Sequence, residues 1–214
     1  HRKVIDAIRV LNRKLNHPIA VLLDTQGPEI RTGDMANDLH LNAGETVSIV
    51  ARGAEDVESS SIHINYEDLI NDVDIGDIIT VDNGLINLEV LSKEERNMQC
   101  KVIDGGLLKS KRHVNLPGIR VNLPAITDKD RRDIKFGISQ EVDFIALSFV
   151  RQAEDIHELR ELLGDKAETT KIIAKLEDQE AITNMVEIIA AADGVMVARG
   201  DLGVEIPLEV LPRI

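Results

Sequence analysis

A lysine and two acidic residues stand where two short apolar runs of the sequence end. Lys175 and Glu177 follow the run at 172–174, and Asp201 follows the run at 195–197. Apolar runs of this kind are typical of parallel strands that are buried on both faces. If the two strands are neighbours, Glu177 and Asp201 converge at the carboxyl end of a parallel sheet, where α/β folds place their chemistry.

This arrangement predicts a charged centre for phosphoryl or enolate chemistry. Glu177 and Asp201 could hold Mg²⁺, which prefers one or two carboxylates together with substrate oxygens and water. Lys175 would supply a fixed positive charge to a transferring phosphoryl group or an enolate. Two plainer interpretations stay open, namely solvated loop acids and a salt bridge between Lys175 and Glu177. We favour the functional interpretation because all three residues follow predicted buried strands.

Two turn segments offer further sites for ions. Asp24, Thr25 and Arg31 could form a cation site and a phosphate clamp, because arginine binds phosphate in a bidentate manner. The glycine-bracketed turn at 199–203 could direct backbone N–H groups at an anion. The alternatives are a surface ion pair of Arg31 with Glu29 or Asp24, and a plain β-turn at 199–203.

The elements that position these residues form an α/β pattern. Four parallel strands make half of a TIM (β/α)8 barrel. An open doubly wound sheet is the competing topology, although no G-x-G-x-x-G follows any strand. The predicted strands lie at 19–23, 144–150, 171–176 and 194–198, and the predicted helices at 1–16, 127–139, 152–163 and 179–192.

Residues 34–122 show a different pattern, with short alternating apolar runs separated by glycine turns. We predict that they form an inserted small all-β barrel that acts as a lid domain on a partial barrel made by 1–33 and 123–214. Near the end of the lid, Lys109, Lys111 and Arg112 could meet nucleotide phosphates; the alternative is a solvated basic edge strand. The predicted lid strands lie at 39–41, 47–49, 62–64, 78–81, 85–90 and 98–102, with a helical turn at 66–72.

Composition excludes several other classes of protein. Among the 214 residues only 2% are aromatic, Trp is absent and the formal net charge is −13, which argues against nucleic acid and anionic membrane as partners. The single cysteine, Cys100, excludes an internal disulfide and fits a reducing compartment. No signal peptide and no apolar run of roughly 18 residues is found, so we expect a cytoplasmic protein, with a plastid as the open alternative.

Several longer motifs resemble pyruvate kinase in residues, order and spacing along the whole chain. They are Leu23-Asp24-Thr25-Gln26-Gly27-Pro28-Glu29-Ile30-Arg31-Thr32-Gly33, Val114-Asn115-Leu116-Pro117-Gly118, residues 143–146 with 148–151, Ile173-Ala174-Lys175-Leu176-Glu177, and residues 197–205. The resemblance implies a (β/α)8 barrel with a mobile β-rich lid. It also implies transfer of a phosphoryl group from phosphoenolpyruvate to ADP, which gives pyruvate and ATP in the last step of glycolysis.

The resemblance further implies a role for each candidate residue. Lys175 and Arg31 would be catalytic, and Lys175 with the backbone at Gly200 and Asp201 would bind the substrate. Two kinds of cation are implied as cofactors, Mg²⁺ (or Mn²⁺) and K⁺, and a glutamate at the position of Glu29 goes with K⁺ dependence. Nucleotide binding falls to Arg31, Lys111 and Arg112, the Mg²⁺ ligands would be Glu177 and Asp201, and Asp24 and Thr25 would contribute to the K⁺ site.

The sequence departs from the family pattern at two positions, and the chain is shorter than the members of the family. Gln26 stands where a lysine is frequent, and His113 replaces a common glycine. We expect a fragment that lacks the N-terminal barrel strands, the last barrel strands and the C-terminal domain of a homotetrameric parent, with poor activity by itself. The alternatives are a Mg²⁺-dependent lyase or aldolase on a similar barrel, and a non-catalytic truncated product.

Overall fold

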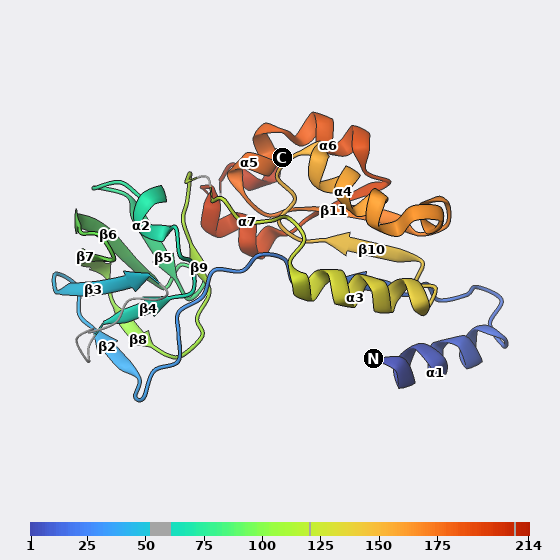
Figure 1. The fold of residues 1–214 in the computed structure, drawn as a ribbon, viewed down its shortest axis with the longest axis horizontal. Helices are drawn as coiled ribbons and strands as arrows, with labels where there is room; N and C mark the ends of the chain where they lie inside the picture. Colours follow the sequence, from blue (N-terminus) through green and yellow to red (C-terminus); the bar gives the residue numbers. More distant parts are fainter. Residues whose placement is uncertain (52–60, 120, 208) are drawn as a thin grey trace. The chain divides into compact units, whose positions relative to one another are not determined.

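The computed structural model describes residues 1–51, 61–119, 121–207 and 209–214, and divides them between two compact units (Figure 1). The parallel-sheet unit comprises His1–Pro28 and Pro124–Ala198, and the β-rich unit comprises Glu29–Leu123 and Arg199–Ile214. This division groups 199–214 with the β-rich unit, whereas the predicted domains at 1–33, 34–122 and 123–214 place them in the barrel. Those domain boundaries stay a prediction, and residues 52–60 and 120 of the predicted lid lie outside the described residues.

A four-stranded parallel sheet forms the centre of the parallel-sheet unit and confirms the α/β prediction. Its strands follow one another in chain order, so this sheet has no reversal of the kind that marks a doubly wound fold. The register pairs Asp24 with Ala146, Leu147 with Ala174, and Leu176 with Val197, so all four carboxyl ends lie at one edge. The strands are β1 (Leu22–Asp24), β10 (Phe144–Leu147), β11 (Lys171–Leu176) and β12 (Gly194–Val197).

The core of this unit is aliphatic and lies between the sheet and its helices. Ile145, Leu147, Ile156, Leu159 and Ile172 have no exposed surface. The outer strand β12 differs, since its residues at 195–197 are 37–41% exposed. The expectation that this apolar run is buried on both faces is therefore wrong within the described residues, because β12 is an edge strand of the sheet.

Two helices lie within one residue of their predicted bounds at 127–139 and 152–163. Helix α3 (Asp128–Ser139) starts with a capping box, in which the Thr127 hydroxyl accepts the Asp130 N–H at 3.1 Å and Asp130 accepts the Thr127 N–H at 3.2 Å. Helix α4 (Ala153–Leu163) ends at Gly164, whose φ of 54° favours glycine.

The predicted helix at 1–16 and the predicted strand at 19–23 are both too long. Helix α1 (Arg2–Asn12) ends at Asn12, whose side-chain amide makes two hydrogen bonds with the backbone of Ile19. It donates to the Ile19 carbonyl at 2.9 Å and accepts the Ile19 N–H at 2.8 Å. With both groups occupied, Ile19 cannot join a strand ladder, and β1 begins only at Leu22.

Two further predictions are wrong. The helix predicted at 179–192 is interrupted at Asn184, whose side chain donates to the Arg151 carbonyl at 2.9 Å, and it forms α5 (Gln179–Thr183) and α6 (Met185–Ala191). The glycine-bracketed turn at 199–203 is part of a helix, α7 (Arg199–Glu205). Burial of Leu202, which is 0% exposed, outweighs the low helix propensity of the glycines there.

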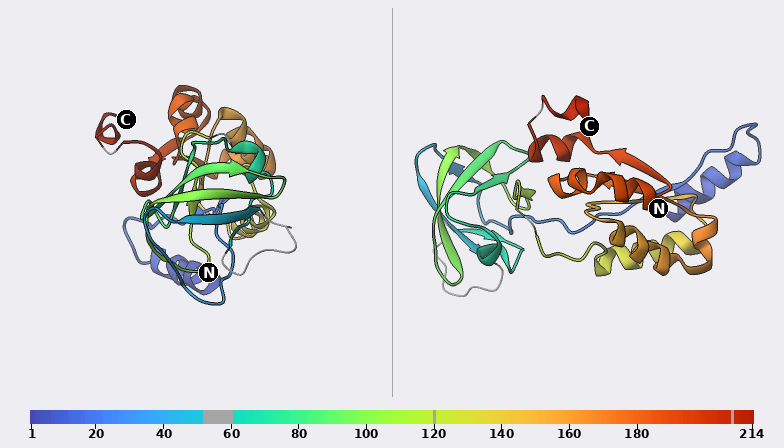
Figure 2. Two further views of the ribbon diagram at one scale, coloured as in Figure 1. Left: turned by 90° about the vertical axis from the view of Figure 1, so that its left-hand side faces the viewer. Right: turned by 90° about the horizontal axis from the view of Figure 1, so that it is seen from above.

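The β-rich unit contains a six-stranded sheet in the order β4-β3-β7-β6-β5-β9 and a two-stranded sheet of β2 and β8. Figure 2 shows several of these strands side by side. All six strands predicted in this region are confirmed, whereas β8 and β9, which span three and two residues, were not predicted. The bounds are β2 (Leu39–Leu41), β3 (Thr46–Ala51), β4 (Ile62–Ile64), β5 (Ile78–Val81), β6 (Ile86–Lys93), β7 (Asn97–Asp104), β8 (Gly106–Leu108) and β9 (Val114–Asn115), with helix α2 at Leu69–Asp72.

A second aliphatic core fills the β-rich unit, independently of the first. Its central residues, Ile49, Ile62, Ile79, Leu88 and Met98, have no exposed surface. Short 3₁₀ turns at Gly164–Glu168 and Leu211–Arg213 complete the secondary structure of the two units. None of the helices in the described ranges is long and apolar enough to cross a membrane.

Candidate active site

Lys175, the residue before the last in β11, is the centre of a charged cluster in the parallel-sheet unit. Its ammonium lies 3.0 Å from Glu177 Oε1 and 3.2 Å from Asp24 Oδ1, and it donates to Ser148 Oγ at 2.8 Å. The lysine side chain is only 14% exposed. The salt bridge with Glu177, which the sequence left open as the plainer interpretation, is therefore present, and Asp24 from the end of β1 adds a second acid.

The charge on Lys175 is stabilised by its partners in spite of burial. Burial lowers the pKa of the ammonium, but the hydrogen bond and charge of Glu177, together with the charge of Asp24, raise that pKa above its ordinary value. Lys175 is therefore a permanent cation at neutral pH and is unsuited to act there as a general base. It can act as a fixed charge.

Glu177 is a buried charged residue, with 2% of its side chain exposed. Its second carboxylate oxygen, Oε2, accepts the backbone N–H of Phe149 at 2.7 Å. Phe149 holds a positive φ of 53°, which is uncommon for a residue with a side chain. Strained backbone of this kind is frequent at functional sites, and here it directs an N–H group at the carboxylate.

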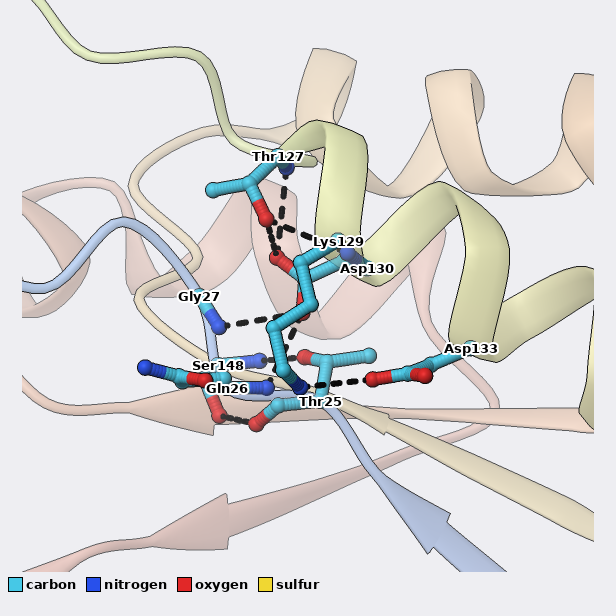
Figure 3. A network of polar contacts seen from close by, with 8 residues as sticks. All are labelled: Thr25, Gln26, Gly27, Thr127, Lys129, Asp130, Asp133 and Ser148. Carbon is cyan, nitrogen blue, oxygen red and sulfur yellow. Dashed lines mark hydrogen bonds and ion pairs between the residues drawn. The ribbon is translucent and has the colours of Figure 1, made fainter.

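Asp24 is the last residue of β1, and Thr25 directly after it is fixed by Ser148, which follows the end of β10. The Ser148 N–H donates to Thr25 Oγ1 at 3.0 Å, and the Ser148 hydroxyl donates to the Thr25 carbonyl at 2.7 Å (Figure 3). Thr25 is 5% exposed, whereas the Asp24 side chain is 56% exposed. The two residues therefore offer an open carboxylate next to a buried threonine that is held in one position.

Arg31 is the centre of a second charged cluster, in the β-rich unit. Its Nε donates to Glu29 Oε2 at 2.7 Å, and its Nη1 donates to the Lys111 carbonyl at 2.9 Å. The hydrogen bond and charge of Glu29 raise the pKa of the guanidinium, although burial opposes this. The ion pair of Arg31 with Glu29, which the sequence left open as the plainer interpretation, is present.

Two more cations and a histidine lie in the same unit. Lys111 pairs with Asp34 at 3.2 Å, and Arg112 Nη1 lies 3.5 Å from Asp82 Oδ1. Within the described part of the chain, the Nε atom of Arg112 is buried without a hydrogen-bond partner. Burial lowers the pKa of His113, which bridges to Arg31 through the backbone, so its imidazole is neutral at neutral pH.

Helix α7 brings Gly200 and Asp201 into the β-rich unit. Asn115 on β9 donates to Glu205 Oε1 at 3.0 Å, and this contact ties the end of α7 to the strand. A methyl group added at Gly200 would meet no atom within 4 Å. There is therefore free space beside the Cα of Gly200 within its own unit.

The structure gathers the predicted site residues into two groups. Asp24, Thr25, Lys175 and Glu177 lie together in the parallel-sheet unit, whereas Arg31, Lys111, Arg112, Gly200 and Asp201 belong to the β-rich unit. The pairing of Glu177 with Asp201 therefore stays a prediction. Among the residues that the structure describes, no group of three or more His, Cys, Asp or Glu side chains is placed to hold a metal ion.

Sequence reasoning missed the contacts that hold the first group in place. Ser148 stands at the end of a predicted strand, as Lys175 does, and that position was the available indication of its role. The strain at Phe149 left no mark in the sequence. Chemically, the first group offers a fixed cation flanked by two carboxylates, an arrangement that can bind a phosphoryl group together with a metal ion.

Comparisons with known proteins agree with this chemistry. Residues 1–214 match the family model for the barrel domain of pyruvate kinase. The chain is 44% identical over 214 residues to plastidial pyruvate kinase 2 of Arabidopsis thaliana, with 99% of this chain and 37% of that protein covered. It is 46% identical over 217 residues to a pyruvate kinase of Staphylococcus epidermidis and 45% identical to one of Staphylococcus aureus, with 100% of this chain and 37% of each relative covered.

Proposed function

The chain belongs to the pyruvate kinase family, and from this premise we propose that it forms part of an enzyme that transfers a phosphoryl group from phosphoenolpyruvate to ADP. The products are pyruvate and ATP. One observation carries the proposal: the Lys175 ammonium contacts Glu177 at 3.0 Å and Asp24 at 3.2 Å at the carboxyl edge of a parallel sheet. A cation fixed in this way stabilises the charge of a transferring phosphoryl group without having to reorganise.

The chain supplies the cations and donors that its substrates require. Lys175 holds the transferring phosphoryl group, and the Arg31 guanidinium binds phosphate oxygens through parallel N–H groups. The backbone N–H groups at Gly200 and Asp201 bind the substrate carboxylate. Lys111 and Arg112 face the nucleotide from the β-rich unit.

The carboxylate and threonine oxygens of the chain are suitable ligands for the divalent ion and the K⁺ that the family resemblance implies. Glu177 with Asp201 would hold Mg²⁺ or Mn²⁺, and the Phe149 N–H at 2.7 Å fixes the Glu177 carboxylate that such an ion needs. Asp24, whose carboxylate is 56% exposed, and Thr25 would contribute to the K⁺ site. When bound, the divalent ion supplies a Lewis acid that polarises phosphoryl oxygens.

We also propose an architecture of half a barrel with an inserted lid domain. Residues 1–33 and 123–214 form half of a (β/α)8 barrel, and 34–122 form a lid domain that excludes water from the reactive phosphoryl donor. The four parallel strands in chain order support this topology. The chain spans 37% of the length of the relatives that it matches. We therefore propose that it is part of a longer enzyme, and from the family resemblance we propose that this enzyme is a homotetramer that works in the cytoplasm.

A coupled assay for pyruvate formation tests the proposal. The longer enzyme that contains this chain is assayed with phosphoenolpyruvate and ADP, with and without K⁺ and Mg²⁺, as wild type and as Lys175→Met. We expect pyruvate only when ADP is present and a loss of about a thousandfold in kcat for Lys175→Met. Unchanged turnover in Lys175→Met would overturn the role of this lysine. Pyruvate formed without ADP would indicate transfer of the phosphoryl group to water instead, and C–C cleavage would indicate a lyase or aldolase.

A further inference from the structure

Asp130, in the first turn of α3, is a fully buried carboxylate for which the proposed chemistry has no direct use. It is 0% exposed. Figure 3 shows the carboxylate between the start of α3 and the loop that follows β1. A buried carboxylate is costly unless hydrogen bonds satisfy its oxygens, so its contacts indicate what it stabilises.

The two oxygens of Asp130 bind different parts of the chain. Oδ2 accepts the Thr127 N–H at 3.2 Å, which is its part of the capping box of α3, and also accepts the Thr127 hydroxyl at 2.6 Å. Oδ1 accepts the backbone N–H groups of Gln26 at 3.0 Å and Gly27 at 3.3 Å. A capping box requires only the first set of bonds, so the second set serves another purpose.

The loop that Asp130 holds follows directly after two site residues. Gly27 has a φ of 73°, and the loop turns there immediately after Asp24 and Thr25. A rigid anchor at Gln26 and Gly27 therefore limits where the Asp24 carboxylate and the Thr25 carbonyl can lie.

The Asp24 carboxylate contacts the Lys175 ammonium directly, and the Thr25 carbonyl is connected to it through the Ser148 hydroxyl. Asp24 Oδ1 lies 3.2 Å from the Lys175 ammonium. The Thr25 carbonyl accepts the Ser148 hydroxyl at 2.7 Å, and the same hydroxyl accepts from Lys175 at 2.8 Å. An unbroken series of polar contacts thus runs from Asp130 through the loop to Lys175, and all of it lies within the parallel-sheet unit.

We propose that Asp130 is a positioning residue for Lys175, because its carboxylate fixes the Gln26–Gly27 backbone and thereby the Asp24 and Thr25 groups that orient the ammonium. Asp130 does not touch the substrate and is not a catalytic residue. The catalytic consequence rests on the proposed function, but the positioning itself does not.

Two variants separate the role of Asp130 in the loop from its role in the helix cap. Asp130→Ala removes both sets of bonds, whereas Thr127→Val removes the hydroxyl contacts of the cap and leaves Oδ1 bound to the loop. Amide hydrogen exchange at Gln26 and Gly27 is measured in both variants and in the wild type. We expect exchange at both amides to be about tenfold faster or more in Asp130→Ala, and within about threefold of wild type in Thr127→Val.

The NMR resonance of the Lys175 ammonium reports whether the lysine itself is repositioned. We expect Asp130→Ala to shift or broaden this resonance and Thr127→Val to leave it in place. In the longer enzyme, kcat should fall about tenfold in Asp130→Ala with the KM for phosphoenolpyruvate changed by less than about twofold. If the enzyme did not have the proposed activity, only the prediction for kcat and KM would be lost. Amide hydrogen exchange and the Lys175 ammonium resonance would still test the positioning role, because neither depends on turnover.

The outcomes that overturn the proposal are specific. It fails if Gln26 and Gly27 exchange equally fast in the two variants, or if the Lys175 resonance is the same in Asp130→Ala as in the wild type. Should Asp130→Ala not fold, the wild type alone decides: protected amides at Gln26 and Gly27 support the proposal, and unprotected amides at both overturn it.

Discussion

The backbone N–H of Phe149 donates to the buried carboxylate of Glu177 at 2.7 Å. Phe149 itself has a φ of 53°, in the left-handed region. The left-handed conformation is unfavourable for a residue with a Cβ, so surrounding structure must maintain it. Gly27 lies against this residue, since a Cβ at Gly27 would come within 2.7 Å of Phe149 Cδ2. The glycine at position 27 therefore permits the phenylalanine to hold the conformation that binds Glu177.

This relationship predicts a large effect for Gly27→Ala. The added methyl group would meet the ring of Phe149 at 2.7 Å and Ser148 Cβ at 3.0 Å, at a position whose φ of 73° already disfavours alanine. We expect a loss of about 3 kcal/mol in the free energy of unfolding, from backbone strain and steric overlap together. Urea unfolding measures the loss.

A matched control isolates the steric part. Gly44 also has a positive φ, of 90°, but a Cβ there would meet nothing within 4 Å. Gly44→Ala should therefore lose only about 1 kcal/mol. Equal losses in the two variants would show that contact with Phe149 contributes nothing.

The two acids beside Lys175 are predicted to differ in their contribution to stability. Glu177 is 2% exposed and Asp24 is 56% exposed, although both contact the same ammonium. Glu177→Gln keeps the volume of the side chain but leaves a buried lysine facing an uncharged amide, so we expect a loss of about 3 kcal/mol. Asp24→Asn should cost about 0.5 kcal/mol, because water screens the exposed pair.

A double-mutant cycle with Lys175→Met checks this difference. Glu177→Gln in the Lys175→Met background should cost much less than in the wild type, because the unpaired charge is gone. Asp24→Asn is taken through a second cycle with the same Lys175→Met background, and thermal or urea unfolding of the proteins of both cycles supplies the two coupling energies. A coupling energy for Glu177 no larger than that for Asp24 would contradict the prediction.

The sequence was informative where local rules decide the structure, and less so where distant residues intervene. The capping box of Thr127 and Asp130, and the position of Lys175 before Glu177 at a strand end, follow from local pattern. The helix break at Asn184 depends on a carbonyl at Arg151, 33 residues earlier in the chain. No periodicity within a segment can encode such a partner.

The candidate site shows the same division. Strand ends identified Asp24, Lys175 and Glu177 as residues of one sheet edge, because parallel strands align their carboxyl ends. The contacts that fix them come from elsewhere: the Phe149 N–H depends on an unusual φ, and the Asp130 carboxylate comes from a helix 104 residues after Gln26. Residue type and spacing thus identify the reactive groups, and tertiary contacts determine their positions.

Gly200→Ala is predicted to weaken substrate binding without lowering the stability of the fold. The added methyl group meets no atom within 4 Å, and alanine favours the helix in which Gly200 lies, so stability should rise by about 0.5 kcal/mol or stay unchanged. The same methyl group would obstruct a carboxylate that approaches the backbone at Gly200. We expect the KM for phosphoenolpyruvate to rise about tenfold in the longer enzyme, with the KM for ADP unchanged. Unchanged KM for both substrates would remove Gly200 from the substrate site.

Tyr66 gives a prediction for pH dependence that a single optical measurement can test. It is the only tyrosine, and the chain has no tryptophan, so alkaline ultraviolet absorbance reports this residue alone. Burial, together with the hydrogen bond that the phenol donates to Asp72, raises the pKa of Tyr66 to about 12, although the Asn122 N–H donated to the phenol oxygen opposes this.

The direction of the stability change follows from that shift. The folded protein holds the phenol proton more tightly than the unfolded chain, so the stabilisation is fully present below pH 10 and is lost as the pH rises toward 12. We expect a titration midpoint near pH 12 in the native protein, moving to about 10 in urea. Asp72→Asn should lower the native midpoint, and Tyr66→Phe should abolish the absorbance change. A native midpoint near 10 would contradict the buried environment of this phenol.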